Sequence, residues 1–173
     1  MANFIIKAAS TDDLLLQNDG GTTIVSIPGS GNPSIADDAG NVIATFETNT
    51  INLGDKTLQR PLIRDYSETE NAIGLTGGGT KDIDLTLGNV HSATVNTGES
   101  TFTFSNPIAT GNCSSFTLIL TNGASQTVNW PPAVDWAGGA APILTAAGID
   151  ILTFTTIDGG TIWYGFMAGT DMK

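Results

Sequence analysis

The stretch "DILTFTTIDGGTIWYGF", residues 150–166, decides the fold class of this chain. Two runs rich in β-branched and aromatic residues flank the Asp-Gly-Gly turn at residues 158–160, which predicts a strand, a tight turn and a second strand. Successive side chains of a strand point to opposite faces, so Trp163 and Tyr164 must lie on opposite faces and one of them fills an interior. The candidates for the apolar faces of this hairpin are Ile151, Phe154, Trp163 and Phe166.

The same alternation of apolar and polar residues continues through most of the chain beyond residue 80. In "DIDLTL", we expect Ile83, Leu85 and Leu87 to point to one face of a strand. About eight short strands at spacings of about 8 to 12 residues are typical of a β-sandwich or a jelly roll. The sequence therefore predicts an all-β protein with a sandwich head at residues 81–173. The glycines of "LTGGGT", residues 75–80, mark the expected domain boundary.

Residues 1–54 read as short strands separated by turns, and they contain a weak internal repeat. Asp19–Ile27 aligns residue for residue with Asp38–Phe46, and each copy begins in a glycine turn. A two-stranded hairpin is marginal in water, so each unit needs apolar partners from elsewhere. The partners come either from the globular part or from the same segment in sister chains, and we expect a docking and trimerisation segment.

Residues 55–80 are expected to form a neck or linker between these parts. "DKTLQRPLIRDYSETE", residues 55–70, is the only plausible helical stretch, but Pro61 would kink or end a helix there. One interpretation is a neck where chains associate, and the other is an irregular linker with solvated charges. In the first interpretation the contacts between chains come from Leu58, Leu62 and Ile63.

Composition excludes several classes of partner. The formal net charge is -11, which opposes binding to the phosphates of nucleic acid. Only 13% of the residues are charged, so the surface is expected to be neutral and rich in hydroxyls. No apolar run reaches the roughly 18 to 20 residues that span a bilayer, and we expect no membrane insertion.

Reactive side chains are scarce. His91 is the only histidine, and it reads as a surface or hydrogen-bonded residue on a strand. Cys113 is the only cysteine and has no partner for a disulfide or a structural zinc site. We expect no catalytic residue, no metal site and no cofactor, so the protein is expected not to be an enzyme. Acidic pairs such as Asp82 and Asp84 read as turn or strand-face residues, with calcium bound between subunits as the alternative.

Tryptophan near Asp135 offers a possible glycan contact. Trp130 and Trp136 lie in "NWPPAVDWAGG", and exposed indoles beside polar groups can stack on sugar rings. The alternative is that both rings serve core or subunit packing.

The segment from Phe116 to the end of the chain resembles the C-terminal domain of structural proteins of tailed bacteriophages, especially marine ones. The resemblance rests on Asn-Trp-Pro at residues 129–131, Asp-Trp-Ala-Gly-Gly at 135–139, and the run from Leu152 to Gly165. It covers roughly residues 66–173. Residues before it are only broadly similar to the hairpin-rich segments with which phage fibres and head decorations attach.

The resemblance implies a homotrimeric protein of the virion surface, with an N-terminal base docked on the particle and a β-sandwich head facing outward. Both capsid decoration proteins and fibres carry such domains. Because about 75 residues folded as hairpins make only a short stalk, we expect a capsid decoration protein that contacts the major capsid protein. The expected apolar anchor is Asn3, Phe4, Ile5 and Ile6. The alternative is a short tail fibre or receptor-binding tip, bound to a tail protein and recognising host surface polysaccharide.

Overall fold

The computed structural model describes residues 14–27, 32–37, 39–47, 51–53 and 58–173. Within these residues the chain forms fourteen strands and two short 3-10 turns, so the prediction of an all-β protein is confirmed. The chain divides into two compact units, Met1–Arg64 and Asp65–Lys173. No helix in the described ranges has the length and apolarity needed to span a bilayer.

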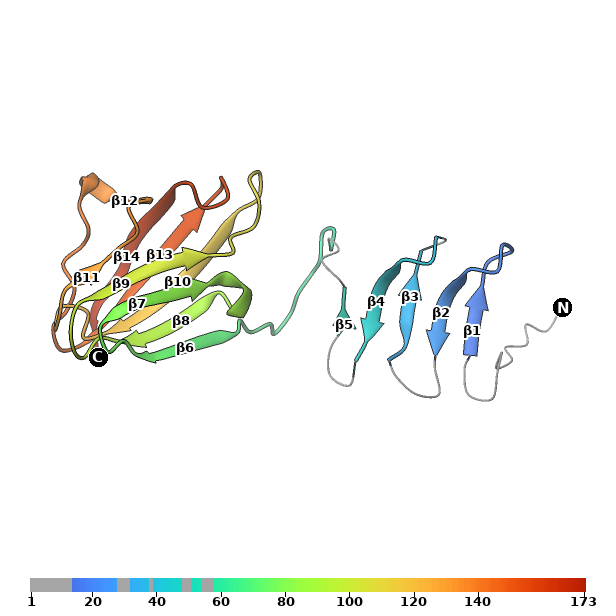
Figure 1. Cartoon of the computed structure of the whole chain (residues 1–173), viewed down its shortest axis with the longest axis horizontal. Coiled ribbons are helices and arrows are strands. Elements are labelled where there is room, and N and C mark those ends of the chain that lie inside the picture. The colour runs from blue at the N-terminus through green and yellow to red at the C-terminus, as the bar shows by residue number, and fades with distance from the viewer. Residues whose placement is uncertain (1–13, 28–31, 38, 48–50, 54–57) are drawn as a thin grey trace. The chain divides into compact units, whose positions relative to one another are not determined.

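The first unit contains a five-stranded antiparallel sheet, here called the N-terminal sheet, whose strands lie side by side in chain order (Figure 1). Each strand pairs with the next, as expected for a series of hairpins. The strands are β1 (Leu14–Gln17), β2 (Thr23–Ile27), β3 (Ser34–Ala36), β4 (Val42–Phe46) and β5 (Ile51–Asn52).

The internal repeat has a structural counterpart in two matching turns. The amide nitrogens of Gly21 and Gly40 each donate to a carbonyl oxygen three residues earlier, at 3.0 Å, on Asn18 and Asp37. The side chains of Asn18 and Asp37 each accept a further bond, at 2.8 Å, from the amide four residues on. Both glycines have positive φ, 81° and 86°, which an L side chain adopts only at a cost. The turn predicted at residues 18–21 is confirmed, while Asp38 lies outside the described residues.

One face of the N-terminal sheet is apolar. Pairing places Val25, Ile35 and Ala44 in one cross-strand row, and Phe46 opposite Ile51 in another. Alternation puts both rows on the same face. The opposite face is mixed: it carries Ser26, Ser34, Thr45 and Asn52, and by the same alternation also Ile24 and Ile43.

This apolar face is open to solvent in the single chain. Ile51 is 61% exposed and Phe46 is 39% exposed, and among the described residues of this unit only Ala36 and Ala44 are buried hydrophobics. The N-terminal sheet is therefore a single layer within the part of the chain that the structure describes.

The second unit is a β-sandwich of a six-stranded and a three-stranded sheet (Figure 1). The larger sheet has the order β12-β14-β13-β10-β8-β6, and the smaller has the order β11-β9-β7. Their strands are β6 (Glu70–Leu75), β7 (Gly79–Asp84), β8 (Val90–Thr94), β9 (Ser100–Ser105), β10 (Ser114–Thr121), β11 (Val128–Asn129), β12 (Val134–Trp136), β13 (Ile149–Thr156) and β14 (Trp163–Met172).

From β6 to β11 the chain passes from one sheet to the other at every step. Next-but-one strands therefore become neighbours and run parallel, as in the pairs β6 with β8, β8 with β10, and β7 with β9. A jelly roll consists of antiparallel strands in two Greek keys, so these parallel pairs differ from it. The last strands close the larger sheet in antiparallel fashion, with β13 between β10 and β14.

Aromatic side chains from both sheets fill the interior. Phe104 of the smaller sheet meets Phe116 and Phe154 of the larger one at ring-centre distances of 4.9 and 5.0 Å, and Trp163 at 5.3 Å. Trp163 is 2% exposed and Tyr164 is 42% exposed, which confirms that the two lie on opposite faces. The hairpin predicted at residues 150–166 is formed by β13 and β14.

The glycine segment at residues 75–80 does not separate two domains. It joins β6 to β7 and so carries the chain from one sheet of the sandwich to the other. Gly78 has a φ of 78°, and a Cβ there would lie 3.2 Å from the carbonyl oxygen of Thr97, so the close approach of two backbones requires glycine. The division between the compact units falls instead after Arg64.

The strand expected over "DIDLTL" ends earlier than its alternation suggests. The carboxylate of Asp84 accepts a hydrogen bond from the amide of Thr86 at 2.9 Å and caps a 3-10 turn, Leu85–Leu87. Leu87 is therefore 53% exposed and does not continue the buried face of Ile83, so the expectation was wrong for that residue. Leu85 is partly buried and still packs against the core.

The proposed neck has no regular structure in its described part. Residues 58–69 contain neither helix nor strand, which fits the irregular interpretation of this segment. Leu58, Leu62 and Ile63 are 59%, 89% and 59% exposed. These three apolar side chains are therefore largely exposed.

Candidate functional site

The two tryptophans considered for glycan binding pack on the interior of the sandwich. The Trp130 ring stacks on Phe102 with a centre distance of 5.4 Å and an interplanar angle of 18°. The Trp136 ring contacts Trp130 and Phe154, both at 5.5 Å. This arrangement agrees with the alternative interpretation, in which the two tryptophan rings serve core packing.

Asp135 lies on the opposite side of its strand from Trp136. The pairing of β12 with β14 places Trp136 against Gly165 and Asp135 beside Tyr164, which is on the outer face of the larger sheet. A Cβ on Gly165 would lie 2.7 Å from the Trp136 ring, so the indole rests directly on that backbone. The structure therefore does not gather Trp130, Asp135 and Trp136 around one surface.

A hollow on the outer face of the six-stranded sheet is the candidate site. We call it the outer groove, and its volume is about 330 Å³. Its floor consists of short hydroxyl side chains on β10 and β13, where Ser115 pairs with Thr155 and Thr117 pairs with Thr153. Short residues there leave room between taller ones on the neighbouring strands.

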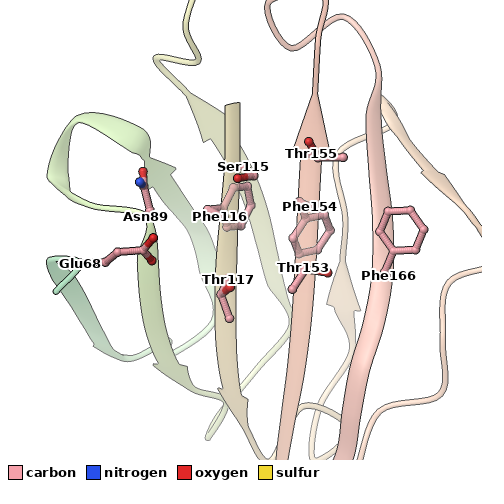
Figure 2. A pocket seen from close by; sticks show the side chains of 9 residues that line it. All are labelled: Glu68, Asn89, Ser115, Phe116, Thr117, Thr153, Phe154, Thr155 and Phe166. Atoms are coloured by element: carbon pink, nitrogen blue, oxygen red, sulfur yellow. The ribbon is translucent and has the colours of Figure 1, made fainter. Parts of the chain in front are cut away.

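Figure 2 shows the walls of the outer groove. Phe166 stands on β14 at one side, beside Thr153, and its side chain is 51% exposed. Glu68 and Asn89 stand at the other side, beyond β10. The groove thus has an aromatic wall, a carboxylate and amide wall, and a hydroxyl floor.

Most polar groups of the outer groove have no internal partner. The side chains of Ser115, Thr117 and Thr153, like those of Glu68 and Asn89, make no hydrogen bond to another described residue. Thr155 differs, because its hydroxyl contacts the Cys113 sulfur at 3.2 Å and donates to the Ser114 carbonyl at 3.3 Å. The groove therefore presents donors and acceptors that the fold itself does not use.

Two further hollows adjoin the outer groove at Asn89, which lines all three. One, of about 470 Å³, has Tyr66 and Leu87 among its lining residues, and the Tyr66 side chain is 69% exposed. The other, of about 340 Å³, includes Ile108 and Cys113. The three hollows therefore meet at Asn89.

The acidic pair on β7 serves the smaller sheet. Asp82 accepts hydrogen bonds from the hydroxyls of Thr103 and Ser105 on the neighbouring strand. Asp84 accepts from the Asn106 amide at 2.8 Å, and this bond, together with those from Thr86, lowers the pKa of its carboxyl. Within the described ranges, His, Cys, Asp and Glu nowhere form a group of three that could hold a metal ion.

His91 is fully buried between the two sheets. Its ring meets Phe116 edge-on at 5.6 Å, and its Nδ1 lies 3.3 Å from the amide nitrogen of Asn71. Nε2 has no partner among the described residues. Burial lowers the pKa of His91 below its ordinary value of 6.5, and the ring is held neutral.

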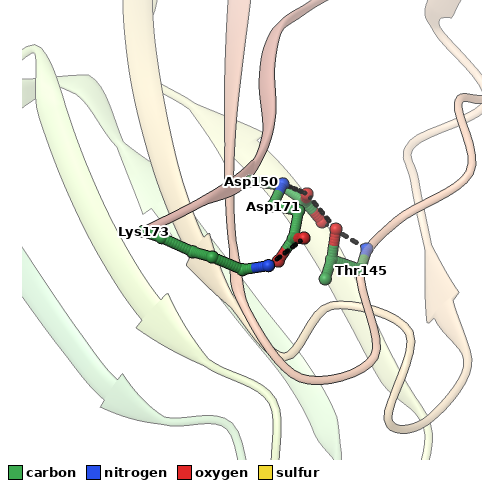
Figure 3. Close-up of polar contacts among 4 residues, drawn as sticks. All are labelled: Thr145, Asp150, Asp171 and Lys173. Carbon is green, nitrogen blue, oxygen red and sulfur yellow. Dashed lines mark hydrogen bonds and ion pairs between the residues drawn. The ribbon is translucent and has the colours of Figure 1, made fainter.

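The buried carboxylate of Asp150 binds the loop just before its own strand and the end of β14 (Figure 3). It accepts from the amide and hydroxyl of Thr145, at 2.6 and 2.7 Å, and from the amide of Asp171 at 3.2 Å. Lys173 pairs with Asp171 at 2.9 Å on the surface. Sequence reasoning missed this cluster, because nothing in the order of residues shows that Asp150 is enclosed.

Asn3, Phe4, Ile5 and Ile6, the expected capsid contacts, lie outside the described residues. The outer groove was missed as well, although the alternating threonines and serines of β10 and β13 were a possible signal for it. Comparisons with protein-family models, with curated proteins and with solved structures found no match for this chain.

Proposed function

We propose that this chain is a non-enzymatic structural protein of a tailed bacteriophage, carried on the virion surface as a homotrimeric capsid decoration protein. The observation that carries the proposal is the open apolar face of the N-terminal sheet, on which Phe46 and Ile51 stand exposed. A sheet with one apolar face requires a second layer to be stable in water. Identical chains can supply that layer to one another.

Three copies can cover these faces by closing around a three-fold axis. In such an arrangement each N-terminal sheet turns its apolar face toward the axis, and no further partner is needed. The resemblance of residues 66–173 to the C-terminal domain of structural proteins of tailed bacteriophages implies a homotrimer and so supports three copies. A face-to-face pair would cover the same surface, and the mass of the assembly distinguishes the two.

The exposed residues of the segment after the sheet support the same assembly. Leu58, Leu62 and Ile63 contribute exposed apolar surface. In the proposed trimer they form contacts between copies at the neck, even though the segment is irregular rather than helical.

The proposed orientation places residues 1–54 on the major capsid protein, with Asn3, Phe4, Ile5 and Ile6 as anchor, and the sandwich outward. Several weak contacts joined in one rigid trimer give high avidity for a capsid lattice. The net charge of -11 would keep particles apart in solution.

Structural roles of the polar residues support a non-enzymatic protein. His91 is held neutral inside the sandwich, and Asp82 and Asp84 accept hydrogen bonds from neighbouring side chains. Asp150 is likewise engaged in holding two segments together.

The assembly is tested by the mass of the full chain over a dilution series, measured by sedimentation or native mass spectrometry. We expect a trimer that Phe46→Asp dissociates, because the charge would enter the shared interior. Thr45→Asp is the matched control on the opposite face of the same strand, and it should leave the trimer intact. A wild-type chain that stays a stable, fully folded monomer on dilution would contradict the proposal.

The virion location is tested by cross-linking intact particles and identifying the linked peptides. Links from residues 1–54 to the major capsid protein are expected. Links confined to tail proteins would replace the decoration assignment with the alternative, a short tail fibre or receptor-binding tip.

A further inference from the structure

The outer groove combines an exposed ring with unused hydrogen-bonding groups. Phe166 projects from a strand whose neighbours on the same face, Thr153 and Thr117, are short and polar. An aromatic ring gains from stacking on an apolar surface, and the C–H face of a sugar ring is such a surface. The Phe166 ring is therefore placed to stack on the C–H face of a sugar.

The polar groups of the groove match hydroxyl-rich ligands. Carboxylate oxygens such as those of Glu68 only accept hydrogen bonds, whereas the Asn89 amide and the Ser and Thr hydroxyls both donate and accept. Elsewhere in the described chain, the carboxylates of Asp82 and Asp150 already accept hydrogen bonds from Thr103 and Thr145. The polar groups of the groove are open to an external partner instead.

Charge selects among such ligands. The lining of the outer groove contains Glu68 but neither Lys nor Arg, and the whole chain carries a net charge of -11. Phosphorylated, sulfated or uronic-acid chains would be repelled. A protein partner is disfavoured too, because the centres of protein interfaces are apolar, whereas this floor is made of hydroxyls.

We propose that the outer groove binds a neutral saccharide chain. Phe166 stacks on one sugar ring, and Glu68, Asn89 and the hydroxyl floor bond to the ring's hydroxyls. The adjoining hollow at Asn89 leads toward the exposed ring of Tyr66, which takes a sugar further along the chain. All these residues lie within 65–173, so the inference does not depend on how the N-terminal sheets assemble.

The test uses the full chain and defined probes: the hexasaccharides of maltose, cellulose and mannan type, with hexagalacturonate as the anionic comparison. Binding is measured by saturation-transfer NMR and calorimetry. We expect at least one neutral hexasaccharide to bind and hexagalacturonate to bind far more weakly. Phe166→Ala should weaken binding roughly tenfold, and Phe166→Tyr should restore most of it.

Two further variants make the result specific to the site. Ile143→Ala is the control, because Ile143 is 93% exposed and lies outside the groove, and it should bind as wild type does. Tyr66→Ala should weaken binding of hexasaccharides while leaving disaccharides unaffected. Circular dichroism checks that each variant is folded.

Three results would each overturn the inference. One is the absence of binding by any neutral probe to the folded wild-type chain at millimolar concentration. Another is binding that Phe166→Ala leaves unchanged. The third is a change in the assembly's mass with Phe166→Ala, which would identify the groove as a contact between copies. None of these bears on the Phe46→Asp test of the N-terminal sheet.

Discussion

In the N-terminal sheet, Phe46 and Ile51 lie opposite each other on neighbouring strands, and in the sandwich Phe116 and Phe154 do the same. The first pair is 39% and 61% exposed, while the second is 3% and 1% exposed. Both pairs lie on neighbouring antiparallel strands. The difference is that a second sheet covers Phe116 and Phe154, whereas among the described residues no second sheet covers Phe46 and Ile51. Full burial of such a side chain is worth about 1.5–3 kcal/mol, so the layer decides which unit is stable in a single chain.

The comparison shows that the two units differ in whether they enclose a hydrophobic interior. The sandwich carries its own interior, made by Phe104 of one sheet against Phe116, Phe154 and Trp163 of the other. The N-terminal sheet has its hydrogen bonds and turns, but Phe46 and Ile51 on its apolar face are exposed. The sandwich thus has an interior of its own, and in our proposal the assembly supplies one to the N-terminal sheet.

The largest effect is expected from opening the interior of the sandwich with Trp163→Ala. Removing this fully buried ring should cost about 3–5 kcal/mol of unfolding free energy, measured by urea unfolding followed by far-ultraviolet circular dichroism. Tyr164→Ala is the control on the neighbouring residue, whose side chain faces outward, and it should cost about 1 kcal/mol or less. Equal costs for the two variants would show that the sandwich interior resembles the open sheet, and the comparison would fail.

A smaller effect is expected from Asp150→Ala. The amide of Thr145 would lose its acceptor in a buried setting, and the loss should cost about 1–3 kcal/mol. Lys173→Ala removes only the surface pair with Asp171 and should cost about 0–1 kcal/mol. Hydrogen exchange at the Thr145 amide checks the mechanism, because faster exchange is expected in Asp150→Ala alone.

The smallest effect is expected from the pH dependence that His91 gives to the sandwich. Because the folded state lowers the pKa of this base, its contribution to stability is complete above about 6.5 and is lost as the pH falls below that value. The Gly88 backbone and then the charges of Asp84 and Asp82 favour the protonated ring and partly oppose the lowering of the pKa by burial, so we expect a small effect.

Urea midpoints at pH 8 and pH 5 measure this dependence. The wild-type sandwich should lose stability between them, and His91→Leu should lose less. The reverse order would mean that the ring is charged in the folded protein.

Local features of the fold were predictable from the sequence. The turns at residues 18–21 and 158–160 follow from glycine and Asx chemistry, and the opposed faces of Trp163 and Tyr164 follow from strand geometry. Each depends on residues close together in the chain. Alternation also identified most of the strands of the sandwich.

Features that depend on distant contacts were misread or missed. Leu85 and Leu87 continue an alternating pattern, but the cap that Asp84 provides turns the chain before they can extend the strand. The glycines at 77–79 resemble a linker, whereas they allow the close approach of the segment around Thr97. The sequence around Trp130 suggested an exposed ring that could bind a sugar, whereas in the structure this ring stacks on Phe102.

The sequence by itself determined an all-β chain, its turns and the opposed faces of Trp163 and Tyr164, because these follow from neighbouring residues and the two-residue period of a strand. Only the tertiary structure decided that consecutive strands from β6 to β11 alternate between two sheets. It also decided that short hydroxyl residues of β10 and β13 lie between Phe166 and Asn89. Both are matters of which strands become neighbours, and that choice depends on packing between residues far apart in the chain.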